Sequence, residues 1–575
     1  MSAQTSLATE ASIAAQRAAE ALAPEAGLVA DVDPVLIGNA ILKTTRGAVQ
    51  NPLGVLDATA RWATGLASAG VATLLRTIGR DAQGPLSPDD DDARFEDPAW
   101  KSNPFFFWRL QRYLVASRLL RDLVDAADLD GTNRGKAEFV IEMLVNAAAP
   151  TNLLLTNPTA LKRAFETGGQ SVARGLANFV YDLLHNGGRP RQVDRSAFTV
   201  GEDLAATPGK VVFRNDLMEL IQYAPQTDEV CEIPLLLSPP WINKYYIMDL
   251  APGRSFVEWA VQHGHTTFAI SYRQADESMA DVSLDDYLIN GPRDALDVIA
   301  DITGSEVVNI VGLCIGGTLT AILLAYLAAT GERRVNSATL LNTLLDFSDP
   351  GPLGTFTDPD TVARIESQMR GKGYLEGSSM RTTFDLLRSN DLIWNYVASN
   401  WLMGEDPPKF DILAWNSDST NLPAAMHSFY LRSCYIENEL ARGEMEIAGT
   451  QLDLSKIQAD VFIVGAKNDH IAPWRSSYTS TQLLSNADVR FVLTSAGHIA
   501  GIVNPPGGKR KYWTQEESPP HPDLWREGST EVNESWWQLW TDWIAERAGS
   551  KREPPPMGSR KYPALQEAPG SYVHE

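Results

Sequence analysis

Basic residues are scarce in this sequence: 49 lysines and arginines stand against 72 aspartates and glutamates, giving 575 residues a formal net charge of -23. Proteins that bind nucleic acid or an anionic membrane need a basic surface, so the charge argues against both partners. Charged residues make up 21% and hydrophobic residues 44% of the chain, as in globular proteins. The length predicts two domains, or one large domain with insertions.

Cysteine is also scarce. Cys231, Cys314 and Cys434 are too few and too far apart for a disulfide framework or a zinc site, so no metal is expected. The N-terminal sequence lacks the basic start and continuous apolar stretch of a signal peptide. Residues 307–330 could cross a bilayer by length, but Asn309 and three glycines interrupt them. A reducing cytoplasm, with no transmembrane segment, is therefore expected.

The first part of the chain divides into two regions of different composition. Residues 1–95 are rich in alanine, and the beginning of this segment is expected to be disordered. From residue 96 to residue 205, apolar residues recur at helical spacing, most clearly in 108–129 and 137–149. This spacing predicts a helical N-terminal domain.

Residues 206–575 are predicted to form an α/β domain. Short β-branched runs alternate here with helical patterns, which favours a mostly parallel sheet covered by helices. The segment of about 345–455 is too long for a simple loop between two strands, so we expect it to form a cap inserted over the carboxyl edge of the sheet. The predicted strands are KVVFRN, MELIQYAP, IPLLLSPP, TTFAISYR, VVNIVGLC, SATLLNT, DVFIVGA and VRFVLTSA.

A cysteine lies between glycines where one predicted strand ends. Gly312-Leu313-Cys314-Ile315-Gly316-Gly317 separates the strand of residues 307–311 from a helix expected from Leu319 onward. Glycines two residues before and after a nucleophile are typical of the nucleophile elbow, a tight strand-to-helix turn. Backbone N–H groups at the helix start favour a thiolate there, and a thiolate suits thioester substrates. The alternative is a buried structural cysteine on a glycine-rich turn.

An elbow enzyme needs an acid after a later strand and a histidine after the last one. Asp469 follows DVFIVGA and His498 follows VRFVLTSA, so these two residues and the cysteine are predicted to form a catalytic triad. Taken separately, the aspartate could be a turn residue and the histidine a surface loop residue. Asp346 and Asp349 are alternative acids. His470 is given a supporting role at most, because adjacent side chains usually point apart.

An oxyanion hole requires two N–H donors beside the nucleophile. Ile315, the residue after the cysteine, is the first candidate donor. The second is expected in the loop SPPWINKYYIMDL of residues 238–250. The prolines of this loop have no N–H group, which leaves Trp241 or Ile242.

These residues resemble motifs of the polyhydroxyalkanoate synthases. GLCIGGT (312–318) is similar to the lipase-like box of that family with cysteine in place of serine, and NDHIAPW (468–474) and AGHIAG (496–501) resemble its acid and histidine motifs. The resemblance extends over residues of about 90–575. Further similar segments are DARFEDPAW (92–100), PPWINKYYIMDL (239–250), LLRSNDLIW (386–394), FDILAWNSDSTNLP (410–423) and APGSYV (568–573).

The resemblance implies an α/β-hydrolase fold with an inserted cap and an N-terminal helical domain. It also implies that (R)-3-hydroxyacyl-CoA thioesters, above all 3-hydroxybutyryl-CoA, are polymerised with release of CoA through a cysteine-bound acyl group, without a cofactor. The long N-terminal extension is similar to the single-subunit types, and CIGGT to class I. The resemblance also implies that the protein is a homodimer. It further implies a cytoplasmic location at the surface of polyester granules, beside granule-associated proteins. Leu313 replaces an expected aromatic residue, which leaves the preferred acyl length open.

Three further features have a functional and a structural interpretation. Trp415 could line an acyl channel or belong to the core, and Arg388 could meet a CoA phosphate or lie on the solvated surface. FFFW (105–108) could contact the granule or pack against the protein. The same triad would also serve a thioesterase or polyester hydrolase, with water as acceptor. A noncatalytic granule scaffold is the alternative from another class.

Overall fold

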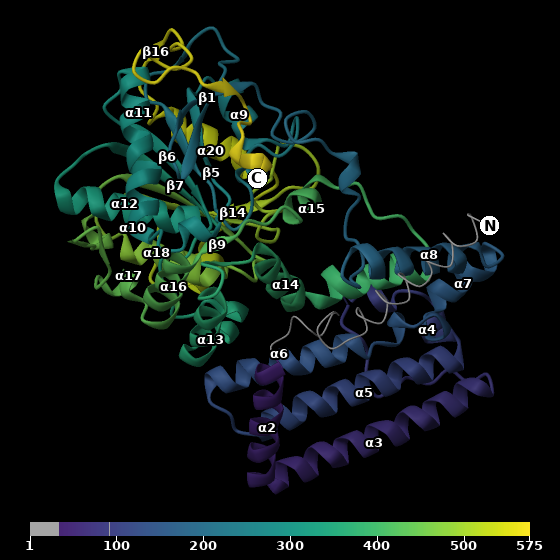
Figure 1. Ribbon diagram of the computed structural model, residues 1–575. Helices are drawn as coiled ribbons and strands as arrows, with labels where there is room; N and C mark the ends of the chain where they lie inside the picture. Colours follow the sequence, from purple (N-terminus) through teal and green to yellow (C-terminus); the bar gives the residue numbers. More distant parts are fainter. Residues whose placement is uncertain (1–33, 91) are drawn as a thin grey trace. The chain divides into compact units, whose positions relative to one another are not determined.

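The computed structural model describes residues 34–90 and 92–575. Within this part of the chain two compact units are distinguished, one helical and one built on a sheet (Figure 1). The helical unit contains the described chain from Pro34 up to Asp194 and the segment Thr382–Lys409, and the sheet unit contains Arg195–Arg381 and Phe410–Glu575. The region expected as one cap, about 345–455, is therefore shared between the two units.

The helical unit begins earlier than the periodicity indicated. Asn51 and Asn103 begin helices by accepting hydrogen bonds from Gly54 N and Phe105 N, as is usual for N-cap residues. Two α-helices lie within the described part of the alanine-rich segment, because alanine is the strongest helix former. The disorder expected at its beginning concerns residues 1–33, outside the described residues. The longer helices are α2 (Pro34–Gln50), α3 (Pro52–Thr77), α5 (Pro104–Ala126), α6 (Gly131–Ala147), α7 (Pro158–Glu166) and α8 (Gln170–His185).

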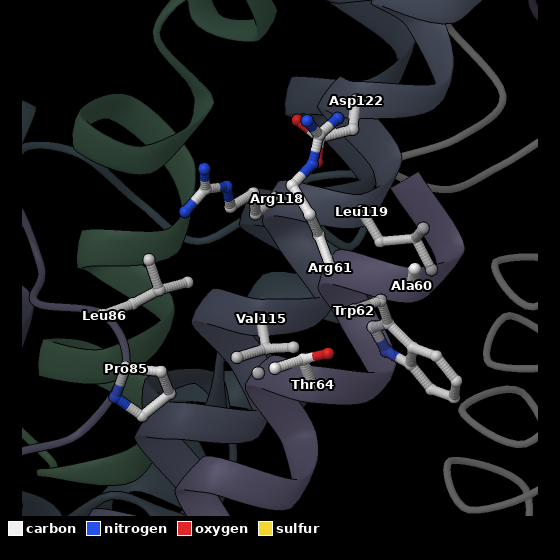
Figure 2. Close-up of a pocket in the computed structure, with 11 residues that line it drawn as sticks. Ala60, Arg61, Trp62, Thr64, Pro85, Leu86, Val115, Arg118, Leu119 and Asp122 are labelled. Carbon is white, nitrogen blue, oxygen red and sulfur yellow. The ribbon is translucent and has the colours of Figure 1, made fainter. Parts of the chain in front are cut away.

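Helices α3 and α5 lie side by side in this unit. A groove of about 320 Å³ lies between them, and Figure 2 shows residues that line it. Arg61 of α3 forms an ion pair of 3.1 Å there with Asp122 of α5. Within FFFW, the side chain of Phe107 is buried and that of Phe105 is half exposed. The FFFW segment therefore contributes to the core as well as to the surface.

The sheet unit is built on a mixed sheet of 11 strands, counted over the described residues. The strands of the central block run parallel, from β5 through β4, β6, β7 and β12 to β13, and the edges are antiparallel. All of the runs predicted as strands are strands. In spatial order these are β15 (Thr530–Val532), β14 (Tyr512–Thr514), β13 (Val489–Thr494), β12 (Asp460–Ala466), β7 (Val335–Leu341), β6 (Val308–Leu313), β4 (Leu235–Ser238), β5 (Thr267–Tyr272), β2 (Met218–Tyr223), β1 (Gly209–Arg214) and β17 (Gln566–Glu567).

Helices cover both faces of the sheet. Helix α12 (Ile315–Thr330) packs on β6 and β7, where Ala338 and Leu340 share a core cluster with Ile322 of the helix. Between them, Thr339 points to the other face and accepts a hydrogen bond of 3.0 Å from Trp540 Nε1. Trp540 belongs to α20 (Trp536–Ala545), which packs against α9 (Phe256–Gln262). This layered arrangement is the α/β-hydrolase fold expected from the sequence.

The uncharged stretch of residues 307–330 contributes to both layers of this core. It divides into β6 and α12, and the side chains of β6 are buried. No helix in the described ranges combines the length and the apolar character needed to cross a bilayer. The missing charges of this stretch therefore reflect burial within the sheet unit.

Candidate active site

Cys314 is the single residue between β6 and α12. Its backbone has φ 54° and ψ −122°, an unusual conformation for a residue with a side chain. The helix begins at Ile315, not at Leu319 as expected from the sequence. Gly316 and Gly317 belong to its first turn, where their missing side chains permit close packing. The cysteine therefore occupies a sharp strand-to-helix turn.

Two glycines of the turn are required by close approaches of the backbone. A Cβ atom on Gly316 would lie 2.3 Å from the carbonyl oxygen of Ser238, and one on Gly312 would lie 2.6 Å from Cα of Gly317. Contacts below 3.0 Å are not tolerated by real Cβ atoms. The G-x-C-x-G spacing thus brings the start of α12 against the end of β4.

The acid and the histidine lie at the carboxyl ends of β12 and β13. His498 Nδ1 donates a hydrogen bond of 2.6 Å to Asp469 Oδ2. The other carboxylate oxygen of Asp469 accepts from the N–H groups of Ile471 at 2.8 Å and Ala472 at 2.9 Å. The Asp469 side chain is 0% exposed. Its carboxylate is therefore fixed, and it holds the histidine ring with the proton on Nδ1.

The third predicted residue is joined to this pair. The His498 ring lies close enough to the Cys314 thiol for the two side chains to interact electrostatically. Burial lowers the pKa of His498, but the charges of Asp469 and of the Cys314 thiolate outweigh burial and raise this pKa well above its ordinary value. Asn342, at the end of β7, donates a hydrogen bond to the carbonyl oxygen of His498. The ring nitrogen that does not face the aspartate is thus free to exchange a proton with the thiol.

The alternative residues have other contacts. Asp346 Oδ1 accepts hydrogen bonds of 2.8 Å from Ser348 N and from Asn438 Nδ2, so it organises its own loop. Asp349 accepts from Gly351 N at 3.3 Å. The histidine joined to the thiol is His498. Geometry therefore favours Asp469 over both alternative acids.

The loop after β4 lies beside the cysteine, because Ser238 of β4 pairs with Gly312 of β6. Across the described residues, the N–H groups of Trp241, Ile242 and Ile315 donate no hydrogen bond to the protein. Unpaired N–H groups beside a nucleophile are what an oxyanion hole requires. The predicted donors thus lie close to the cysteine turn, and both Trp241 and Ile242 stay candidates for the second donor.

The two predicted substrate residues differ in their surroundings. Trp415 is buried, and its Nε1 donates a hydrogen bond of 2.7 Å to the carbonyl oxygen of Lys244. This contact gives the tryptophan a structural role in holding the loop after β4. Arg388 lies in the helical unit, is 45% exposed and pairs with Asp391. The contacts of Trp415 and Arg388 with substrate stay predictions.

Sequence reasoning missed two tyrosines near the thiol. Tyr430 and Tyr435 belong to the segment Tyr430–Ile436, and their rings lie 5.6 Å apart. Burial, and to a smaller degree the charge of Cys314, raises the pKa of both tyrosines. Their spacing along a helix is typical of any core segment, so no signal in the sequence distinguished them.

The fold and the cysteine turn define an α/β-hydrolase-fold enzyme with a thiol at the nucleophile position. The α/β-hydrolase fold family matches residues 251–505, and the family "Poly-beta-hydroxybutyrate polymerase (PhaC) N-terminus" matches residues 91–260. Poly(3-hydroxyalkanoate) polymerase of Methylorubrum extorquens is 43% identical over 530 residues, which is 91% of this chain and 87% of the relative.

Two further relatives extend the likeness. Poly(3-hydroxyalkanoate) polymerase subunit PhaC of Cupriavidus necator is 44% identical over 501 residues, covering 86% of this chain and 84% of the relative. Poly(3-hydroxyalkanoate) polymerase 1 of Ectopseudomonas oleovorans is 42% identical over 493 residues, which is 85% of this chain and 88% of the relative. The chain belongs to the poly(3-hydroxyalkanoate) polymerase family, whose members are enzymes of the acyltransferase type.

Proposed function

We propose that the protein polymerises (R)-3-hydroxyacyl-CoA thioesters, with 3-hydroxybutyryl-CoA as the first candidate, and releases CoA. The observation that carries this proposal is the chain of contacts from Asp469 through His498 to Cys314, on a turn that is strained at the cysteine. A thiol in this position forms an acyl thioester, from which an alcohol can accept the acyl group. No cofactor takes part in either step.

In the acylation step, His498 takes the proton of the Cys314 thiol. The thiolate attacks the acyl-CoA carbonyl, and the oxyanion accepts hydrogen bonds from the N–H groups of Ile315 and of Trp241 or Ile242. The carbon–sulfur bond to CoA then breaks. The CoA thiolate leaves with the proton from the imidazolium, and a 3-hydroxyacyl group remains on the cysteine.

In the elongation step, a 3-hydroxyl group attacks a thioester. His498 takes the hydroxyl proton, the alkoxide oxygen forms the new ester bond, and the sulfur leaves as a thiolate. Asp469 acts through the histidine in this proposal, because its carboxylate is fully buried and engaged with three donors.

The proposed setting is the cytoplasmic surface of polyester granules, with the protein as a homodimer beside granule-associated proteins. Exposed apolar side chains on α3 support contact with an apolar surface. Leu53, Leu56, Leu74 and Ile78, at and just beyond this helix, are each at least 63% exposed. These residues lie at the two ends of α3, and exposed apolar patches are typical of interaction surfaces.

Release of CoA from (R)-3-hydroxybutyryl-CoA, followed together with light scattering, tests this function. The wild type is expected to release CoA as turbidity rises, and Cys314→Ala to do neither. Cys231→Ala is the matched control, because that thiol is buried and lies beside Lys551. Release without turbidity would favour a thioesterase or polyester hydrolase. Absence of release, also with longer acyl chains, would favour a noncatalytic granule scaffold.

A further inference from the structure

The last residues of the chain run along one edge of the sheet unit. Strand β17 pairs antiparallel with β1, and Ala568 N donates a hydrogen bond of 2.9 Å to the carbonyl oxygen of Gly209. We call residues 565–575 the C-terminal strap. The strap does not end at this pairing but continues to a buried carboxylate.

Glu219 of β2 is the anchor of the strap. Its side chain is 0% exposed and accepts hydrogen bonds from Ser571 N at 2.9 Å, Ser571 Oγ at 2.8 Å and Tyr572 N at 3.0 Å. Arg214 Nε donates to the same carboxylate at 2.8 Å. A Cβ atom on Gly570 would lie 2.3 Å from this carboxylate. A buried carboxylate is tolerated only when it is satisfied in this way, so the strap is tightly fixed.

Beyond this anchor the strap contacts a buried lysine. Lys244 Nζ donates a hydrogen bond of 3.0 Å to the carbonyl oxygen of Tyr572, and the Lys244 residue is only 4% exposed. Burial lowers the pKa of Lys244, while Asp418 and Glu575 raise it. The buried ammonium group therefore depends on the strap for an acceptor.

Lys244 ends the loop that carries the candidate oxyanion donors. The opposite side of this loop is held by neighbouring backbone and side chains: Thr420 N donates to the carbonyl oxygen of Ile242 at 2.9 Å, and Trp415 Nε1 donates to that of Lys244 at 2.7 Å. These contacts use carbonyl groups of the loop. The N–H groups of Trp241 and Ile242 are left available, and the lysine side chain is the part of the loop that the strap holds.

We propose that the C-terminal strap is a positioning element of the active site. Fixed on Glu219, it holds Lys244 through the carbonyl group of Tyr572 and thereby sets the position of the oxyanion donor in the loop. Lys244 and Glu219 are positioning residues and do not contact the reacting atoms. This inference rests on the proposed function, because it assigns a task to the loop in the acylation step.

The test compares two lysines that both contact the strap. Lys244→Met removes the contact between the loop and the Tyr572 carbonyl of the strap. Lys210→Met removes an exposed ion pair of 3.0 Å between Lys210 of β1 and Glu567 of the strap. The first readout is single-turnover CoA release from (R)-3-hydroxybutyryl-CoA. The second is alkylation of Cys314 by iodoacetamide, which forms no oxyanion. We expect Lys244→Met to slow acylation at least about tenfold. The substrate concentration that gives half the maximal single-turnover rate, and the rate of alkylation, should both stay within about twofold of wild type. Lys210→Met should leave both readouts unchanged.

A purely structural role of the strap predicts a different pattern. Lys244→Met would then slow alkylation and acylation together, or affect neither, and either result overturns the inference. Lys244→Arg retains a cationic donor for the Tyr572 carbonyl and should restore most of the acylation rate. If Lys244→Met does not fold, Glu219→Gln supplies the same comparison, because its NH2 group faces the Arg214 guanidinium, which donates to the carboxylate in the wild type, and so weakens the anchor of the strap. A wild type that releases no CoA from any acyl-CoA overturns the proposed function and this inference together.

Discussion

Asp469→Asn is predicted to change which nitrogen of His498 carries a proton. In the wild type one carboxylate oxygen accepts from the N–H groups of Ile471 and Ala472, and the other accepts from His498 Nδ1. In the variant, the two backbone donors hold the amide oxygen in the same place. The amide nitrogen then faces Nδ1, so the ring carries its proton on Nε2 and cannot take one from Cys314.

The size of the effect differs between the two chemical steps. The same exchange in a Ser-His-Asp enzyme lowers kcat by about 10⁴-fold through the wrong tautomer. An alcohol needs the base as much as a serine does, so elongation should fall by about 10⁴-fold. A thiol ionises by itself near pH ~8.5, so acylation should fall only about 10²-fold near neutral pH. That loss corresponds to about 2.7 kcal/mol in the activation free energy.

The pH dependence of Cys314 alkylation should also change in the Asp469→Asn variant. Asp469 raises the pKa of His498, so its loss lowers this pKa and removes the imidazolium that stabilises the thiolate. The rate of Cys314 alkylation by iodoacetamide should therefore rise at a higher pH in the variant than in the wild type. Single-turnover CoA release should recover over the same range. Asp349→Asn is the matched control and should resemble wild type. A wild-type alkylation profile in Asp469→Asn would refute the assigned acid.

Gly316→Ala should lower the free energy of unfolding by about 1–3 kcal/mol, because its Cβ atom meets the carbonyl oxygen of Ser238. Chemical denaturation measures this, with Gly371→Ala, where a Cβ atom meets nothing within 4 Å, as the neutral control. Burial lowers the pKa of His265 to about 4, so its stabilising contribution is full above about pH 6.5 and is lost as pH falls towards 4. The wild type should lose about 3 kcal/mol more than His265→Gln over this range, measured by denaturation at each pH; equal losses would contradict the assignment. Cys434→Ala should leave the alkylation profile unchanged, since burial raises the pKa of that thiol; a slower profile would show that Cys434 reacts.

Eight strands of the sheet could be predicted because each is a short apolar run between turn residues, whereas the short edge strands β14, β15 and β17 were not predicted. The order of Cys314, Asp469 and His498 after their strands also follows from local patterns, since parallel strands bring their carboxyl ends to one edge. Their catalytic roles stay predictions. The start of α12 at Ile315 was missed, because glycines usually mark a turn and here serve close packing.

Contacts between distant parts of the chain lay beyond the sequence. The segment Thr382–Lys409 has the same helical periodicity as its neighbours, so nothing marked it as part of the helical unit. Lys244 and Tyr572 are separated by 328 positions, and a lysine in a loop is ordinarily exposed. Which carbonyl group such a side chain meets is set by packing of the whole sheet unit.

The central claim is that the growing acyl group is bound to Cys314. Wild-type protein mixed with (R)-3-hydroxybutyryl-CoA, quenched in acid within the first turnover and digested, can be analysed by peptide mass spectrometry. The account predicts one or more 3-hydroxybutyryl units on the peptide that contains Cys314, formed as fast as CoA is released. Release of CoA at the same rate with this peptide unmodified would contradict it.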